Sequence, residues 1–277
     1  MHGIACFMTI DPPMERRDII AGRLAQGQSV TAGSLAEEFS VSPDAIRRDL
    51  RALAAEGRCR RVYGGALPIS PASSPIIGRV GEARERKAAL AAAAVGLIRP
   101  GEFVFLDNGS TNLTLAEVLP SLELTIATNS VAIAAMLADR LDLRLHLVGG
   151  LVDAEIGGSV DATAVLAVQQ MNVDRCFLGA CSASAVEGVS AFDPADAAFK
   201  RVLLTCSRRI VMMVTNDKLG TGAPHRVTPL DHIDSLVVEH DAATHSEFEA
   251  ITRLGVDIVA GKSPARSARP RPRHFAL

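Results

Sequence analysis

The spacing of hydrophobic positions changes along the chain and divides it into segments. Up to Leu67, apolar residues recur at helical intervals between short polar turns. The stretch Pro68–Pro75 is rich in Pro and Ser, offers few side chains to pack and is typical of a linker. From Glu82 onward, short apolar runs alternate with helix-like stretches. The predicted segments are a mainly helical domain at 14–67, a linker at 68–81, an α/β domain at 82–261 and a disordered basic tail at 262–277.

Short runs of β-branched and aliphatic residues predict the strands of the second domain, and the stretches between them predict its helices. Strands that alternate with helices pair in parallel, so the expected fold class is α/β with a mostly parallel sheet. The predicted strands are Phe103–Leu106, Leu124–Ala127, Leu143–Val148, Arg175–Leu178, Ile210–Val214, Ser235–Val238 and Asp257–Val259. The predicted helices include Asn112–Leu119, Val131–Asp139, Ala162–Met171 and Ala195–Ser207.

The first domain contains two predicted helices joined by a short turn. Ser42 can cap the second helix, and Pro43 suits its first position, where no backbone N–H is needed. Ile46, Leu50 and Leu53 are spaced four and three residues apart, which predicts one buried face. This is the pattern of a helix-turn-helix, whose second helix can enter the major groove of DNA.

The formal net charge of −2 hides a local cluster of positive charge. Between Arg47 and Arg61 there are six arginines against two acidic residues, a pattern typical of a surface that binds DNA. The Gly-Gly turn after Tyr63 predicts a β-hairpin wing, whereas an aromatic content of 4% argues against a base-stacking platform for single strands. The candidate DNA-binding residues are Ser42, Asp44, Arg47, Arg48, Arg51, Arg58, Arg60, Arg61 and Tyr63.

Polar residues follow three successive predicted strands. In the segment Asp107–Thr111 an acid, a glycine and two hydroxyls precede a helix, an arrangement suited to an anion because backbone N–H groups and the helix dipole point at it. Thr128–Ser130 and Gly149-Gly150 follow the next two strands. Ligands of open parallel sheets bind beyond the carboxyl ends of the strands, so one shared pocket is expected there.

Other classes of protein find little support in the composition. The five Cys form no Cys-x-x-Cys pair, so buried thiols are expected rather than disulfides or zinc ligands. The seven His show no metal-ligand spacing, and no metal or cofactor is expected. Met1–Ile10 lacks the pattern of a signal peptide, and the apolar stretch Ala88–Ile98 is too short to cross a bilayer. A cytoplasmic protein without a membrane segment is therefore expected.

Four motifs of the first domain follow one another in a recognisable order. They are Glu15-Arg-Arg17, Leu35–Ser42, Ile46-Arg-Arg-Asp-Leu50 and Arg61–Ala66. In this order they resemble the DeoR family of bacterial transcriptional regulators, which implies a winged helix-turn-helix that binds operator DNA. Family members usually have Thr before the Ile-Arg-Arg-Asp motif. Here it is Ala45, which removes one hydroxyl that can contact phosphate.

The resemblance continues into the second domain. The matching motifs are Glu85-Arg-Lys87, Asp107–Thr111, Thr128–Ser130, Gly149-Gly150, Phe177–Ala180 and Lys200. Sensor domains of this family are similar to ribose-5-phosphate isomerase and related sugar-phosphate-binding folds. The resemblance implies that Gly109, Ser110 and Thr111 hold the phosphate of an effector. The other implied effector-binding residues are Asp107, Thr128, Asn129, Gly149 and Gly150, with Lys200 and Lys218 pointing into the pocket.

The expected function is a transcriptional repressor that binds double-stranded operator DNA as a homo-oligomer and responds to a phosphorylated sugar or related metabolite. The alternative is a sugar-phosphate isomerase, in which Asp107 supplies the carboxylate and Lys200 or Lys218 the cation. Thr215 stands where the family usually has Asp, which argues against catalysis. A third class, a protein-interaction adaptor, would need the arginine-rich helix to bind an acidic protein surface, and nothing else in the sequence supports it.

Overall fold

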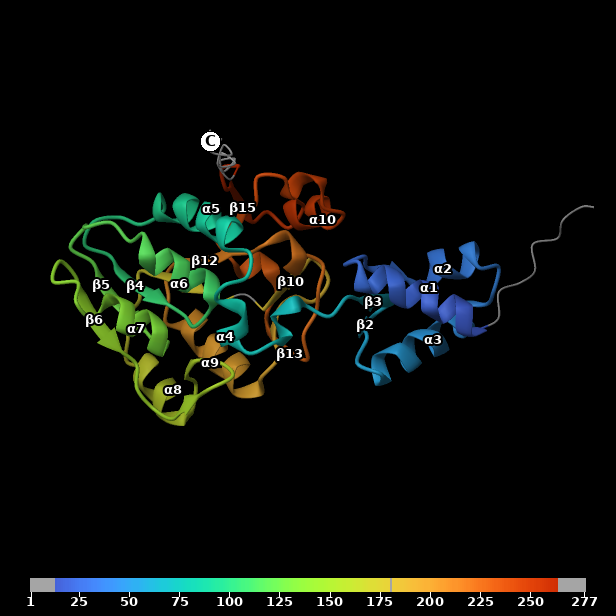
Figure 1. The fold of residues 1–277 in the computed structure, drawn as a ribbon, viewed down its shortest axis with the longest axis horizontal. Coiled ribbons are helices and arrows are strands. Elements are labelled where there is room, and N and C mark those ends of the chain that lie inside the picture. The colour runs from blue at the N-terminus through green and yellow to red at the C-terminus, as the bar shows by residue number, and fades with distance from the viewer. Residues whose placement is uncertain (1–12, 180, 264–277) are drawn as a thin grey trace, which may run out of the picture.

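The computed structural model describes residues 13–179 and 181–263, which form two parts joined by one segment (Figure 1). The smaller part, the reading head, comprises residues 13–67 and is drawn in blue. Its helices pack around a small antiparallel sheet in the order β1-β3-β2. The elements of the reading head are α1 (Pro13–Ala25), β1 (Val30–Thr31), α2 (Ala32–Glu38), α3 (Pro43–Ala55), β2 (Arg60–Val62) and β3 (Gly65–Leu67).

The second helix of the motif, α3, forms as its sequence predicts. The Ser42 side chain accepts a hydrogen bond from the backbone N–H of Ala45 at 3.3 Å, and the helix begins at Pro43. Ile46, Leu50 and Leu53 are buried in the core of the reading head. The predicted helix-turn-helix and the hairpin that follows it are therefore confirmed.

The larger part, the sensor domain, is built on a seven-stranded sheet in the order β15-β14-β12-β9-β4-β5-β6. All neighbouring strands are parallel, so the predicted parallel sheet is confirmed. Each strand lies where an apolar run predicted one. The strands are β4 (Phe103–Leu106), β5 (Thr125–Thr128), β6 (Arg144–Leu147), β9 (Arg175–Leu178), β12 (Ile210–Met213), β14 (Ser235–Val238) and β15 (Asp257–Ala260).

Helices cover both faces of this sheet, each with its own hydrophobic core (Figure 1). Leu90 and Leu115 belong to the core on one face, and Phe105 and Phe199 to the core on the other. Burial on both faces explains why the central strands β4 and β12 are continuously apolar. The helices are α5 (Arg84–Val95), α6 (Ser110–Glu117) and α7 (Val131–Leu137) on the first face, and α8 (Ala162–Val168), α9 (Pro194–Thr205) and α10 (Phe248–Thr252) on the second.

Several small elements have no clear hydrophobic pattern and were not predicted. They are short, and some of their residues are Gly, Ser or Asp, which have low strand propensity. They comprise the antiparallel sheet β10 (Ser182–Ser184), β11 (Gly188–Ala191) and β13 (His225–Thr228), the hairpin β7 (Val152–Asp153) with β8 (Gly158–Ser159), and the 3₁₀ turns η2 (Asn216–Lys218), η3 (Leu230–His232) and η4 (Ala242–Thr244).

The predicted linker packs against the sensor domain, contrary to the expectation that it has little to pack. We call residues 68–79 the strap; it contains η1 (Pro71–Ser73) and α4 (Ile76–Arg79). The Ser70 hydroxyl donates to the carbonyl of Cys181, and Ala72 is buried. Serine and proline can still form a defined contact when their few polar groups find backbone partners, which the composition does not reveal.

Some sequence predictions fall outside the part of the chain that is described. Most of the predicted disordered tail, from residue 264 onward, lies there, as does Cys6. The other four cysteines are free thiols, and Cys59 and Cys176 are buried. Within residues 13–179 and 181–263, no helix is both long and apolar enough to cross a bilayer.

The pairing of the wing hairpin with β1 depends on the absence of a side chain at Gly65. A Cβ atom there would lie 2.0 Å from the carbonyl oxygen of Val30 on the neighbouring strand. We expect Gly65→Ala to force β1 and β3 apart and to lower the free energy of unfolding by about 1–3 kcal/mol. Gly33→Ala is the matched control, because no atom lies within 4 Å of its Cβ position and alanine favours the helix. Thermal unfolding checks both variants, and an unchanged Tm for Gly65→Ala would contradict the expectation.

Candidate functional site

The strand order of the large sheet reverses between β4 and β9, and polar groups meet beyond the ends of these two strands. Asp107 follows β4, and its Oδ2 atom accepts a hydrogen bond from the backbone N–H of Gly179, which follows β9, at 2.8 Å. A Cβ atom on Gly179 would lie 2.2 Å from the carbonyl oxygen of Asn108, so only glycine allows the two loops to approach so closely. Such reversal points are where open α/β sheets bind ligands.

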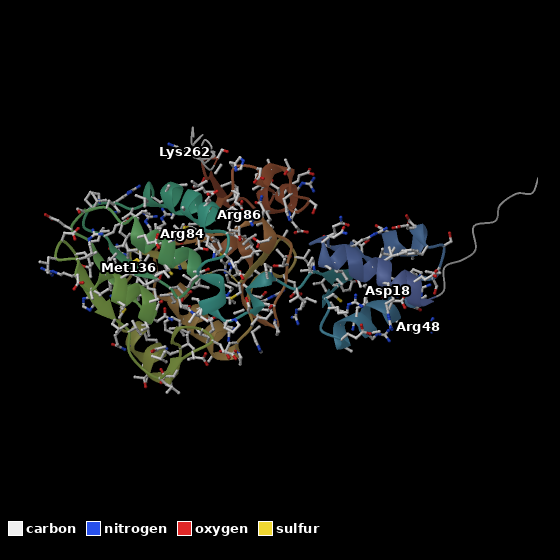
Figure 2. All side chains as sticks on the ribbon, in the orientation of Figure 1. Asp18, Arg48, Arg84, Arg86, Met136 and Lys262 are labelled. Carbon is white, nitrogen blue, oxygen red and sulfur yellow. The ribbon has the colours of Figure 1, made fainter. Side chains whose placement is uncertain are left out.

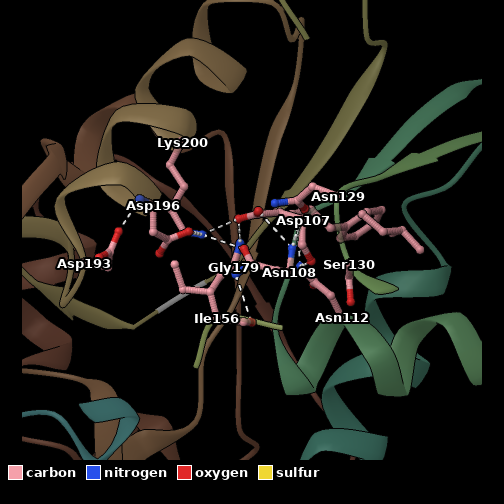
Figure 3. A network of polar contacts seen from close by, with 12 residues as sticks. Asp107, Asn108, Asn112, Asn129, Ser130, Ile156, Gly179, Asp193, Asp196 and Lys200 are labelled. Carbon is pink, nitrogen blue, oxygen red and sulfur yellow. Dashed lines mark hydrogen bonds and ion pairs between the residues drawn. The ribbon is translucent and has the colours of Figure 1, made fainter. Parts of the chain in front are cut away.

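The ammonium group of Lys200 lies at the centre of a buried network (Figure 3). Its Nζ atom lies 2.8 Å from Asp107 Oδ2, 2.6 Å from Asp196 Oδ1 and 3.0 Å from Asn108 Oδ1. An ammonium group has three N–H donors, and these three acceptors occupy them all. Lys200 therefore holds the loop after β4 against α9 and has no donor left for a ligand.

The charges in this network stabilise one another. Burial raises the pKa of Asp107 above its usual value, although Lys200 opposes the shift. Burial alone would lower the pKa of Lys200, but Asp107 and Asp196 more than offset this and raise it. The network therefore combines two carboxyl groups with one ammonium group beside the site.

A cavity of about 80 Å³ opens beside this network. Ser110, Thr111 and Asn112, the first turn of α6, lie in its wall, and no side chain caps this helix end. The backbone N–H groups of a first helical turn have no partner within the helix and attract anions. The small volume favours a compact ligand.

Positive charge gathers on another side of the cavity. Lys218 of η2 and Arg79 of the strap line it, and Lys87 of α5 is close behind. Burial lowers the pKa of Lys218, and the charges of Arg79 and Arg86 add to this effect. Burial and the neighbouring Lys218 lower the pKa of Lys87 to about 8. A bound anion would relieve the repulsion among these cations.

The structure brings only part of the predicted effector-binding set to the cavity. Gly109, Ser110, Thr111, Lys200 and Lys218 line it. Asp107 does not line it, because Lys200 and the two loop backbones surround its carboxylate.

Four further predicted residues also lie outside the cavity wall, so the expectation that they line it differs from the structure. The Thr128 hydroxyl donates to the carbonyl of Leu106, and the Asn129 amide bonds to backbone groups of neighbouring loops. Gly149 and Gly150 are exposed, and Gly150 packs against Asp161 at the start of α8.

Other residues of the cavity wall escaped the sequence analysis. Asn108 lies within the Asp107–Thr111 motif but was not assigned a role, and Asp193 could be recognised only as the cap before Pro194. The strap contributes Ala72–Ile76 and Arg79, a contribution that only the tertiary packing reveals. Within the described ranges, no group of three or more His, Cys, Asp or Glu residues is arranged to hold a metal ion.

The reading head presents a second candidate site on the outer side of α3 and the wing. Arg48, Arg51 and Arg61 are exposed, and none has an ion pair or side-chain hydrogen bond in the part of the chain that is described. Figure 2 shows Arg48 at the end of the head that lies away from the sensor domain. Tyr63 at the hairpin turn is fully exposed. Unpaired guanidinium groups on a helix and wing are suited to DNA phosphates and guanine edges.

The other candidate DNA-binding residues have partners within the protein. The Ser42 hydroxyl caps α3, Asp44 pairs with Arg47 at 2.6 Å, and Arg58 lies 3.7 Å from Glu56. These contacts are exposed and leave the residues within reach of DNA.

Arg60 differs from the prediction. Its Nε atom lies 3.3 Å from Glu187 of the sensor domain, and its side chain packs over Gly222. The alternation of side chains along β2 turns Arg60 to the face opposite that of Arg61. Arg60 therefore joins the two domains and is not part of the exposed arginine surface.

A helix-turn-helix that exposes unpaired arginines, joined to a domain with a small polar cavity, defines a DNA-binding transcriptional regulator that senses an effector. Residues 16–72 match the DeoR-like helix-turn-helix domain, and residues 82–240 match the DeoR C terminal sensor domain. The chain belongs to the DeoR family.

Relatives of similar length carry regulator names. The chain is 30% identical over 254 residues to the uncharacterized HTH-type transcriptional regulator YgbI of Escherichia coli K12, covering 91% of this chain and 99% of that protein. It is 29% identical to the putative aga operon transcriptional repressor of Escherichia coli O157:H7, covering 88% and 93%. It is also 29% identical to the glycerol-3-phosphate regulon repressor of Escherichia coli K12, covering 81% and 90%.

Among solved structures, ribose 5-phosphate isomerase A from Methanocaldococcus jannaschii covers 48% of this chain and 53% of its own, with 16% identity and a TM-score of 0.36. The probable sor operon regulator from Shigella flexneri covers 65% of this chain and 85% of its own, with 10% identity and a TM-score of 0.35.

The Lys200 network makes a testable contribution to stability. Lys200→Met would leave Asp107 and Asp196 buried without their cation, so we expect the free energy of unfolding at pH 7 to fall by about 3–5 kcal/mol. The loss should shrink toward pH 5, because an unpaired buried carboxyl has a raised pKa and folds in its neutral form. Adding Asp196→Asn should restore part of the stability. Urea unfolding at both pH values measures this, and a loss below about 1 kcal/mol would contradict it.

Proposed function

We propose that this protein is a transcriptional repressor whose affinity for operator DNA is set by a small phosphorylated metabolite bound in the sensor domain. One observation carries the proposal: the uncapped first turn of α6 opens onto a cavity that Lys218 and Arg79 also line. A phosphate dianion is the ligand that matches free N–H groups and two cations.

The opposite charges around the cavity define the rest of the ligand. Asp193 and Asp196 line it together with Lys200, and carboxylate oxygens accept hydrogen bonds from hydroxyl groups. A phosphorylated polyol or sugar supplies an anion at one end and hydroxyl donors along its length. Glycerol 3-phosphate, which the name of one relative contains, is a compound of this kind.

We propose that the pocket binds this metabolite and does not convert it. An isomerase needs a carboxylate that can take a proton from carbon. Both oxygens of Asp107 already accept bonds from Asn108, Gly179 and Lys200. Thr215, which stands in place of an acid, is buried and has no proton-accepting carboxylate. These contacts support a sensor over the alternative enzyme.

On DNA, we propose that two or more subunits present paired reading heads, with α3 in the major groove and Tyr63 of the wing near the backbone. Homo-oligomers with paired helix-turn-helix motifs match half-sites about one DNA turn, ~34 Å, apart. A ligand that favours another arrangement of the heads would alter operator affinity, and DNA would alter ligand affinity by the same factor.

The test is a mobility shift with DNA from upstream of the protein's own gene and a panel of compounds. The panel holds glycerol 3-phosphate, pentose and hexose phosphates, and the same compounds without phosphate. We expect one phosphorylated compound to change operator affinity about 5- to 150-fold, and its unphosphorylated form to have no effect. Chromatography shows whether a panel compound is converted. If a compound is converted and the protein does not bind the DNA, the protein is an isomerase instead.

Arg48 should contribute directly to operator binding. We expect Arg48→Ala to weaken it by about 1–3 kcal/mol and to lower the slope of log affinity against log salt by about one, since one phosphate contact is lost. Arg253→Ala is the matched control, because Arg253 is an equally exposed arginine on the sensor domain that pairs with Glu249. Titrations at several salt concentrations measure both. If Arg48→Ala and the wild type had the same operator affinity and the same salt dependence, α3 would not be the recognition helix.

A further inference from the structure

The strap is fixed to the sensor domain at both ends and forms a wall of the effector cavity between them. At its start, the backbone N–H of Gly222 donates to the carbonyl of Pro68 at 3.1 Å, and Ser70 bonds to Cys181. At its end, the Ile76 backbone N–H donates to the carbonyl of Glu155 at 2.9 Å. Residues 73–75 between these anchors are exposed on one side and line the cavity on the other.

Arg79 is the cation that the strap brings to this cavity. Its Nε atom donates to the carbonyl of Ser74 at 2.8 Å, which holds the end of the strap in a turn. The structure shows no partner for its two terminal nitrogens within residues 13–179 and 181–263. A guanidinium with two free terminal nitrogens can bind a phosphate in a bidentate manner. Lys218, which also lines the cavity, supplies a second basic group near Arg79.

Arg79 and Lys218 are both linked to the wing of the reading head, Arg79 through the chain and Lys218 through a tertiary contact of the segment that follows it. The strap begins directly after β3, so Leu67 of the wing is followed by the anchored residue Pro68. Lys218 is followed after a short turn by Gly222, which contacts the side chains of Arg60 and Leu67. A shift of either cation toward an anion therefore acts on the segments that support the wing.

There is also room for such a shift. A surface crevice separates the reading head from the sensor domain beside the strap. Leu24 and Gln26 of the head line one side, Asn216 of η2 lines the other, and Pro68 and Pro71 lie between them. The bonds from the head to the sensor across this region are few and polar, including Arg60 to Glu187 and Ser29 to Glu247 at 3.4 Å. The Ser29 contact is exposed and exchanges at little cost, whereas the contact of Arg60 is partly buried.

We propose that Arg79 binds the anionic group of the effector and that the strap thereby transmits ligand binding to the reading head. The transmission of ligand binding to the reading head rests on the proposed function, whereas the contact between Arg79 and an anion does not. When the anion is bound, Arg79 moves toward it with the strap, and the displaced Pro68 end reorients the wing and the paired α3 helices. The effector thus touches the covalent connection between the two domains.

Four variants of the full chain, including Arg79→Lys, test this proposal. Arg79→Met removes the anion contact, and Arg84→Met is its matched control, since Arg84 is an exposed arginine outside the cavity wall that lies 3.8 Å from Glu117. Ser70→Ala releases the first anchor of the strap and removes no side chain that itself lines the cavity. Calorimetry with inorganic phosphate measures the anion site. Mobility shifts with and without the panel compound that acts on the wild type measure transmission, and circular dichroism checks folding.

We expect Arg79→Met to weaken phosphate binding about 10- to 100-fold, as for other charged hydrogen bonds. Arg79→Lys should restore part of the phosphate affinity. Ser70→Ala should bind phosphate as the wild type does, within about twofold, yet lose most of the ligand effect on operator affinity.

Each part of the proposal can fail separately. Wild-type phosphate affinity in Arg79→Met, or no phosphate binding by the wild type, would overturn the anion contact. A full ligand response in Ser70→Ala would overturn transmission through the strap. If no panel compound changes operator binding of the wild type, the proposed function fails instead, while the phosphate measurements still decide the role of Arg79.

Discussion

The sensor domain depends on one charged contact, the ammonium of Lys200 between two buried carboxylates. Asp107 ends a central strand and Asp196 lies on a helix of the other layer, so the contact joins the sheet to the helix that covers it. Because the cost of burying these charges is offset only when all three are together, the loops after β4 and β9 have one stable arrangement. That arrangement places the first turn of α6 at the edge of the cavity. The shape of the proposed effector site therefore follows from a contact that has no donor left for a ligand.

Two kinds of sequence pattern were sufficient to predict most of the architecture. Strands buried on both faces must be apolar throughout, so β4, β5 and β12 could be located within one or two residues. Ser42 and Pro43 marked the start of the recognition helix because a helix end needs a cap and tolerates proline. Both patterns involve residues that are close together in the sequence, so they can be recognised without knowledge of the tertiary contacts.

What could not be predicted depends on partners distant in the sequence. Arg60 and Arg61 are neighbours of the same type, yet only the register of the hairpin decides which faces Glu187. The cavity wall formed by the strap depends on Ser70 meeting the carbonyl of Cys181, more than a hundred residues away. Gly150 follows a strand as an effector-binding residue would, but it packs against Asp161. A motif predicts which type of residue follows a strand, but it does not predict the direction in which the side chain of that residue points.

The position of Tyr63 has a consequence for studying the protein in solution. The chain has no Trp and a single Tyr, and this Tyr is fully exposed at the tip of the wing. Tyrosine fluoresces at longer wavelengths than phenylalanine. Nearly all of the intrinsic fluorescence at these wavelengths therefore comes from Tyr63, at the surface proposed to contact DNA. The molecule thus contains a natural spectroscopic label, which reports on the environment of the wing without chemical modification and is silent about the interior of the sensor domain.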